Sequence, residues 1–141
     1  MKLLTSAILA ASLLTSSLAF AQSDKDVADA RAAGERWMKQ MDNEEYAAAW
    51  TNSSEGLRKE MSKFTWSMVG SATHLALGEL KSRTFKAASS KPAPAGKQVS
   101  VLFAYVSNYS KSPKVDETIT VIHEPDGVWR VTGYTFTDAK K

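Results

Sequence analysis

The sequence predicts an α+β domain in which N-terminal helices pack on a curved, four-stranded antiparallel sheet. Apolar residues recur at helical spacing up to about Leu77, and they alternate with a period of two from Glu79 to Phe136. The two patterns occupy separate halves of the chain, and no internal repeat interrupts them. Helices followed by strands are typical of an α+β domain rather than of an alternating α/β fold.

Residues 1–21 have the organisation of a cleavable signal peptide. Lys2 precedes an uncharged run from Leu3 to Leu18, and Ala19-Phe20-Ala21 forms a small-x-small cleavage site. The alternative is a membrane anchor, but Ser and Thr interrupt the run, which is shorter than the roughly 20 apolar residues that span a bilayer. We therefore expect cleavage after Ala21, a single domain over residues 22–141, and a periplasmic location without membrane anchoring.

Charge and cysteine content narrow the classes of partner. Loss of Lys2 leaves 17 basic residues (18 − 1) and 15 acidic residues, a formal charge of +2, which is too small to predict binding to nucleic acid or to anionic membranes. The chain has no cysteine, so it has no disulfide and cannot be a lipoprotein. Because stability must then come from packing, most of the four Trp, four Tyr and five Phe are expected in the core.

The first helix is expected to begin near Asp24. Ser23 followed by Asp26 resembles a capping box, in which the serine oxygen accepts an amide of the first turn. The helix is amphipathic, and its apolar stripe consists of Val27, Ala30, Gly34, Trp37 and Met41.

A second helical region follows an acidic stretch, Asp42-Asn43-Glu44-Glu45. The acids could suggest a metal site, but Asp42 and Glu45 also have the spacing of a helix N-cap and its reciprocal partner, which we prefer. Tyr46 and Trp50 share the next helical face, and Thr51–Ser54 breaks the pattern. One further helical stretch is expected to contain Leu57, Met61, Phe64, Trp66, Met68 and Val69, to be weakened at Gly70, and to end at Gly78.

Four strands are expected in the second half of the mature chain. They are Leu80–Lys86, Gln98–Tyr109, Val115–Glu124 and Val128–Phe136. The composition of Ala87–Lys97, with Pro92 and Pro94, predicts a loop. Pro125-Asp126-Gly127 predicts a tight turn that makes the last two strands a hairpin, so the last three strands form an antiparallel meander.

Two motifs resemble a known bacterial family. These are Leu77-Gly78-Glu79-Leu80-Lys81-Ser82-Arg83, and Glu117-Thr118-Ile119-Thr120-Val121 followed by Asp126-Gly127-Val128-Trp129-Arg130-Val131-Thr132-Gly133-Tyr134. Together with four aromatic residues ahead of them, they are similar to domain of unknown function 4019, a family of small exported proteins of Gram-negative bacteria. The resemblance implies the cone-shaped, cystatin-like fold shared by nuclear transport factor 2, ketosteroid isomerase and scytalone dehydratase. It implies no function.

One position departs from the family pattern. The family resemblance places an arginine four residues before the glycine of the Leu-Gly pair, where this chain has His74. Any anion contact made by that arginine would be weaker here, or would depend on pH.

The implied fold often holds a pocket between the helices and the concave sheet. Its expected neighbours here are Tyr46, Trp50, Trp66, Tyr105, Glu117 and Trp129, although Glu117 and Trp129 could face opposite ways. Core packing without a ligand is the interpretation that we prefer for these residues. Glu117 stands out because a carboxylate within an apolar strand must be paired or solvated. Arg83 and Arg130 are the candidate partners of Glu117, and a structural Glu–Arg pair is the expected arrangement. Arg83 is also the seventh candidate ligand-binding residue.

These residues do not form a catalytic signature. The sequence has no Gly-x-Ser-x-Gly elbow of a serine hydrolase and no glycine-rich phosphate loop. Neither His74 nor His123 has a carboxylate at the spacing of metal ligands on a shared helix or strand face. We therefore expect no metal and no cofactor. The leading hypothesis is a non-catalytic exported domain that binds a small apolar molecule or an envelope protein. The alternatives are an isomerase- or dehydratase-like enzyme with a pocket carboxylate, and a module that forms a homodimer through its sheet.

Overall fold

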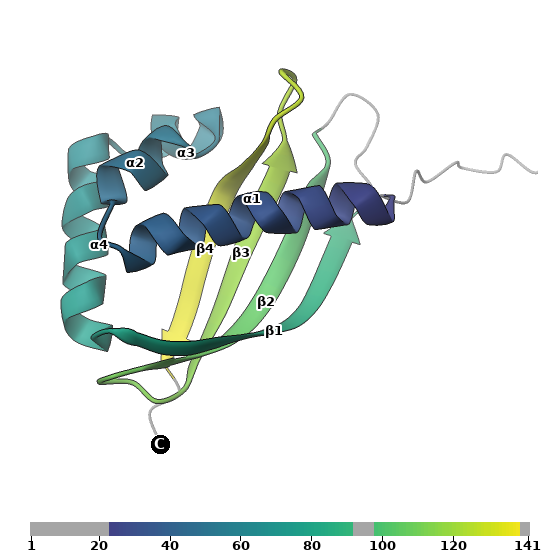
Figure 1. Cartoon of the computed structure of the whole chain (residues 1–141). Coiled ribbons are helices and arrows are strands. Elements are labelled where there is room, and N and C mark those ends of the chain that lie inside the picture. The colour runs from purple at the N-terminus through teal and green to yellow at the C-terminus, as the bar shows by residue number, and fades with distance from the viewer. Residues whose placement is uncertain (1–22, 92–97, 139–141) are drawn as a thin grey trace, which may run out of the picture.

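The computed structural model describes residues 23–91 and 98–138, and it has the predicted α+β architecture. Figure 1 shows helix α1 lying across the sheet, with three shorter helices gathered at one side of it. The expected signal peptide and Pro92–Lys97 lie outside the described residues, so export stays a prediction. The elements are α1 (Asp24–Asp42), α2 (Tyr46–Thr51), α3 (Glu55–Glu60), α4 (Lys63–Leu77), β1 (Leu80–Lys91), β2 (Ser100–Tyr109), β3 (Val115–His123) and β4 (Trp129–Asp138).

Helix α1 begins where its capping residue predicts. The Ser23 hydroxyl oxygen accepts a hydrogen bond from the Asp26 amide at 3.1 Å, and the helix starts at Asp24. Its apolar face covers the concave side of the sheet. Gly34 allows this close approach, because a methyl group in its place would collide with the side chain of Ile119 on β3.

The end of α1 differs from the prediction for Asp42. Asp42 does not cap α2: it is the last residue of α1, and the residue before α2 is Glu45, whose side chain makes no capping hydrogen bond. The chain leaves α1 through Glu44, which has a φ of 63°, and the Glu44 and Glu45 amides donate to the Met41 and Gln40 carbonyls. This arrangement satisfies the helix C-terminus without the Asp42 side chain.

The helical stretch expected from Leu57 onward consists of two helices. Met61 is extended (φ −141°, ψ 130°), and the Ser62 hydroxyl then accepts from the Thr65 amide, so that α4 begins at Lys63. Gly70 does not weaken α4, because it lies within the helix at a contact with Tyr46. Helix α4 ends at Gly78, as predicted, and the φ of 80° there suits glycine.

The sheet is a four-stranded antiparallel meander with the strand order β1-β2-β3-β4, which confirms the prediction. Strand β1 is longer than expected, because Ala87–Lys91 pair with β2 rather than forming a loop. The apolar partner strand and a register shift between Phe85 and Ala87 outweigh the loop-like local composition.

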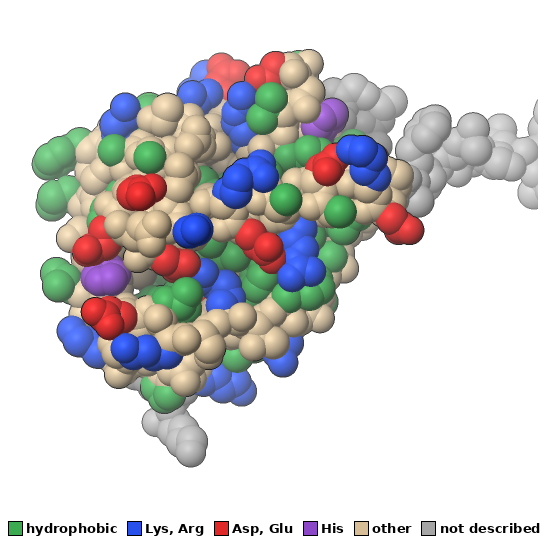
Figure 2. All heavy atoms as spheres, in the orientation of Figure 1, with side chains coloured by type: hydrophobic (Ala, Val, Ile, Leu, Met, Phe, Trp, Pro, Cys, Tyr) green, Lys and Arg blue, Asp and Glu red, His purple; other side chains and the backbone are tan. Residues whose placement is uncertain are grey.

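The core lies between the concave face of the sheet and α1. Its largest fully buried sheet residues are Phe103 and Ile119, which lie under Trp37 and Met38 of α1. By contrast, the outward face of α4 is apolar and exposed. Figure 2 shows hydrophobic side chains at the left edge of the molecule, where Figure 1 places α4. Its exposed apolar residues are Phe64, Met68, Val69 and Leu75. Within residues 23–91 and 98–138, no helix combines the length and the apolar character that a bilayer crossing requires.

Candidate functional site

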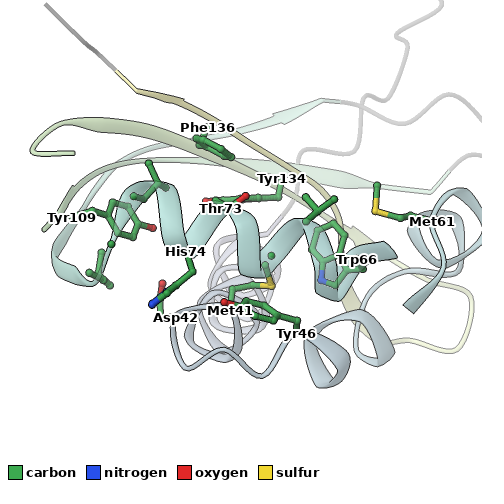
Figure 3. Close-up of a pocket in the computed structure, with 15 residues that line it drawn as sticks. Met41, Asp42, Tyr46, Met61, Trp66, Thr73, His74, Tyr109, Tyr134 and Phe136 are labelled. Atoms are coloured by element: carbon green, nitrogen blue, oxygen red, sulfur yellow. The ribbon is translucent and has the colours of Figure 1, made fainter. Parts of the chain in front are cut away.

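A cavity of about 240 Å³ lies between α4 and the sheet, where the C-terminal end of α1 meets both (Figure 3). Figure 3 places Trp66 and Met61 toward one end of the cavity, and Tyr109, His74 and Asp42 toward the other. The remaining lining residues come from α1, α2, α4, β1 and β4, and they are Met41, Tyr46, Val69, Gly70, Thr73, Leu77, Gly78, Leu80, Tyr134 and Phe136.

The cavity is mainly apolar and opens to solvent. Val69 and Phe136, which line it, are 47% and 40% exposed, so its opening carries apolar side chains. Met41 and Met61 add unbranched side chains to the wall, and methionine adapts readily to the shape of a bound molecule. Apolar walls with a few polar groups are characteristic of small-molecule sites.

Two buried donors in the cavity wall have no hydrogen-bond partner among the described residues. They are the Tyr46 hydroxyl and the Trp66 indole Nε1. Burial, with a smaller effect from the nearby Glu44 carboxylate, raises the pKa of Tyr46, so its hydroxyl keeps its proton at neutral pH. Each unpaired buried donor costs roughly 1–3 kcal/mol of stability.

Behind one end of the cavity, Glu117 of β3 is the centre of a buried polar cluster. Its carboxylate accepts hydrogen bonds from the Tyr134 hydroxyl at 2.8 Å and the Tyr109 hydroxyl at 3.0 Å. The Arg83 guanidinium donates to both oxygens, with Nη2 at 3.1 Å from Oε1 and 3.2 Å from Oε2. Glu117 is therefore fully buried but fully paired, which is the expected Glu–Arg arrangement.

Arg83 also holds Asp42 at the end of α1. Its Nη1 lies 2.7 Å from Asp42 Oδ2 and its Nη2 lies 3.1 Å from Oδ1, which is a bidentate pair. Burial opposes the charge on Arg83, but the hydrogen bonds to Asp42 and the attraction of Glu117 outweigh it and raise the pKa of the guanidinium. One arginine thus neutralises part of the charge of two carboxylates.

The two tyrosines of this cluster remain protonated. Burial, followed by the negative charge of Glu117, raises the pKa of both Tyr109 and Tyr134 well above the usual value for tyrosine. Each hydroxyl therefore keeps the proton that it donates to Glu117. The oxygen of Tyr134 retains capacity to accept a further hydrogen bond, because a phenol oxygen has two lone pairs.

Comparison with known proteins supplies the family. A family model described as "Protein of unknown function (DUF4019)" matches residues 33–134, which is more than half of the chain. The chain belongs to the DUF4019 family. This confirms the resemblance carried by the two sequence motifs. A comparison with curated proteins found no match.

Solved structures that resemble this DUF4019 protein share its nuclear-transport-factor-2-like fold. Aln2 from a Streptomyces species has a TM-score of 0.59 and 12% identity, over 83% of this chain and 93% of that chain. ActVI-ORFA from Streptomyces coelicolor has a TM-score of 0.55 and 10% identity, over 80% and 96%. A protein from Catenulispora acidiphila has a TM-score of 0.53 and 10% identity, over 79% and 89%. Identities this low show a common fold and nothing more.

Of the seven candidate residues of the DUF4019 protein, Tyr46 and Trp66 line the cavity. Glu117 lies behind Tyr109 and Tyr134 and does not line it, so its carboxylate is not placed as a pocket base. Arg83 is part of the same cluster, and it also lines a separate hollow between α1 and β1 together with Tyr105.

Trp50 and Trp129 lie away from the cavity. The Trp50 indole donates to the Met61 carbonyl at 2.7 Å, which joins α2 to the segment that follows α3. Trp129 faces α1 near the opposite end of the sheet, where it lines a different hollow and its ring lies 4.8 Å from that of His123. Arg130, the other candidate partner of Glu117, instead pairs with Glu124 and Asp126.

Sequence reasoning missed several lining residues, above all Tyr109, Tyr134 and Asp42. The alternation Val101, Phe103, Tyr105 continues through Ser107 to Tyr109, so Tyr109 could have been identified. Tyr134 could not, because a register shift beside Thr120 turns it inward where strict alternation would have placed Gly133. Within the described segments, no group of three metal-ligating side chains lies close enough to hold an ion.

Proposed function

We propose that this DUF4019 protein binds a small, predominantly apolar molecule in the cavity between α4 and the sheet. The observation that carries the proposal is an open, mainly apolar cavity of about 240 Å³ whose opening exposes Val69 and Phe136. Tyr46 and Trp66 support it, because their aromatic rings add apolar surface to the cavity wall.

The polar cluster favours binding over catalysis. A pocket base needs a carboxylate that faces the substrate and has a free lone pair in its direction. Glu117 instead directs both oxygens at Arg83, Tyr109 and Tyr134. The cluster therefore braces one end of the cavity, and the isomerase- or dehydratase-like alternative has no positioned base in Glu117.

The proposal is tested by titrating the protein with N-phenyl-1-naphthylamine, a neutral apolar dye that fluoresces in apolar surroundings. We expect saturable binding to the wild-type protein. Thr73→Phe should reduce the affinity at least about tenfold, because the added ring fills the cavity and Thr73 makes no side-chain hydrogen bond to another described residue that the change would remove.

Ala72→Phe is the matched control, because Ala72 is an exposed neighbour on the same helix and does not line the cavity. It adds the same ring and should leave the dye affinity unchanged. Circular dichroism of both variants checks that they are folded. Absence of saturable binding, or equal binding by folded Thr73→Phe, would contradict the proposed function.

A further inference from the structure

The cavity wall has an unbalanced set of charges. Among the residues that line it, Asp42 is the one carboxylate, and there is no lysine or arginine. The remaining ionisable side chain that could become positive is His74, whose Nε2 lies 3.6 Å from the exposed carboxylate of Glu44.

The nearby arginine does not restore the balance. The charge of Arg83 is shared between Asp42 and Glu117, so two carboxylates and one guanidinium leave a formal charge of −1 (−2 + 1). Tyr109 and Tyr134 are neutral, and their protons are directed at Glu117 rather than at the cavity. The group formed by Asp42, Glu117 and Arg83 therefore carries a net formal charge of −1 behind this end of the cavity.

Asp42 and Tyr134 offer hydrogen-bond acceptors at this end of the cavity. Each Asp42 oxygen accepts one hydrogen bond from Arg83 and keeps a further lone pair, and the Asp42 side chain is 20% exposed. The Tyr134 oxygen also keeps a lone pair. A ligand group that meets Asp42 and Tyr134 must donate hydrogen bonds, and a positive charge on that group would be attracted.

We infer that the ligand is an apolar amine, with its hydrocarbon part along α4 and its ammonium group at Asp42. This inference rests on the proposed function and specifies the ligand class of the same cavity. An alcohol could donate one hydrogen bond there but would lack the charge attraction. A carboxylate would be desolvated beside a like charge, which is unfavourable.

The test compares three ligands with the same chain length: octylamine, 1-octanol and octanoate. Each displaces N-phenyl-1-naphthylamine from the wild-type protein at about pH 8, where an alkylamine is protonated and a carboxylic acid is ionised. Octylamine should bind most tightly, at least about tenfold more tightly than octanoate, with octanol between them. The ratio should shrink as the salt concentration rises, because salt screens charge interactions.

Asp42→Asn tests the residue assigned to the ammonium group. It should reduce the ratio of octylamine to octanoate affinity by about tenfold, and this ratio is measured within one variant, so a general change in affinity cancels. Asp116→Asn is the matched control, because it removes the same charge from an exposed position on the opposite face of β3. Its ratio should equal that of the wild type.

The two proposals fail in different ways. If the dye does not bind, or binds equally to Thr73→Phe, the cavity is not a ligand site and both proposals fail. If the dye binds as expected but octanoate competes as well as octylamine, the amine inference alone is wrong. The wild-type comparison decides this even if Asp42→Asn does not fold.

Discussion

For Glu117, the sequence predicts that the carboxylate is buried and paired, but it does not predict what the pair does. The sequence indicates that a carboxylate in an apolar strand needs a partner, and Arg83 is that partner. Arg130 was an equal candidate by sequence, but it lies opposite Ile122, on the outer face of the sheet. Side-chain alternation therefore decides between the two arginines, because only Arg83 reaches the concave face.

Removal of Arg83 should lower the stability more than removal of Arg130. Arg83→Met leaves the Glu117 carboxylate buried without a positive partner, so the free energy of unfolding should fall by roughly 3–5 kcal/mol. Arg130→Met leaves the Glu124 carboxylate, which is 9% exposed, with the Glu55 amide as a remaining donor, and it should cost less, about 1–3 kcal/mol. Urea denaturation measures both values.

A further substitution links the loss to Glu117. Addition of Glu117→Gln to Arg83→Met removes the uncompensated charge and should recover part of the lost stability. Equal losses for Arg83→Met and Arg130→Met would show that the cluster around Glu117 contributes no more than the pair of Arg130 and Glu124.

At the scale of elements, the contact between α2 and α4 depends on Gly70. A methyl group at this position would lie 2.5 Å from Cδ1 of Tyr46, whose ring fills the space against the helix. Tyr46 also lines the cavity, so this contact shapes both the core and the candidate site.

We therefore expect Gly70→Ala to lower the free energy of unfolding by about 1–3 kcal/mol, as overpacking does. Gly56→Ala in α3 is the matched control, because the nearest atom would lie 3.7 Å away and alanine favours helix. Gly56→Ala should be neutral or slightly stabilising in thermal denaturation. A neutral Gly70→Ala would mean that Tyr46 moves aside at little cost.

The elements also show where local sequence reasoning stops. The start of α1 at Ser23, the end of α4 at Gly78 and the alternating strands are determined by local chemistry, and the predictions for them were confirmed. Ala87–Lys91 look like a loop by composition, and their pairing with β2 depends on residues distant in the sequence. The division between α3 and α4 was missed because Met61 fits the apolar helical stripe although its backbone is extended.

For the whole molecule, the protonated tyrosines predict alkaline instability. Burial, followed by the charge of Glu35, raises the pKa of Tyr105 to about 12, and the pKa values of Tyr109 and Tyr134 are raised as well. Between the model-peptide pKa of about 10 and the folded value, the folded protein holds protons that the unfolded chain has released. The free energy of unfolding should therefore fall as the pH rises above about 10.

Urea denaturation at increasing pH tests this dependence. Tyr134→Phe removes one of the raised groups, so its stability should decline less steeply above about pH 10 than that of the wild type. The ultraviolet absorbance of tyrosinate gives an independent measurement of the titration. Parallel declines in the two proteins would show that Tyr134 titrates alike in the folded and unfolded states.

The sequence predicted the architecture of the molecule better than its cavity. Helix and strand periodicity determined the order of the layers, and two of the expected pocket neighbours, Tyr46 and Trp66, line the cavity. The rest of the cavity wall depends on how α1 ends and on the irregular strand register beside Thr120. Neither feature can be predicted from the local pattern of apolar residues. Asp42 illustrates this, since its partner lies 41 positions away on β1.

Arg83 also connects the edge strand β1 to other parts of the fold. Strand β1 pairs only with β2, yet through Arg83 it is bonded to Asp42 on α1 and to Glu117 on β3. These bonds are concentrated near the end of β1 that begins at Leu80, which lines the cavity. Separation of this strand would consequently start at Lys91 and advance toward Arg83, so the cavity wall would be the last part of β1 to open.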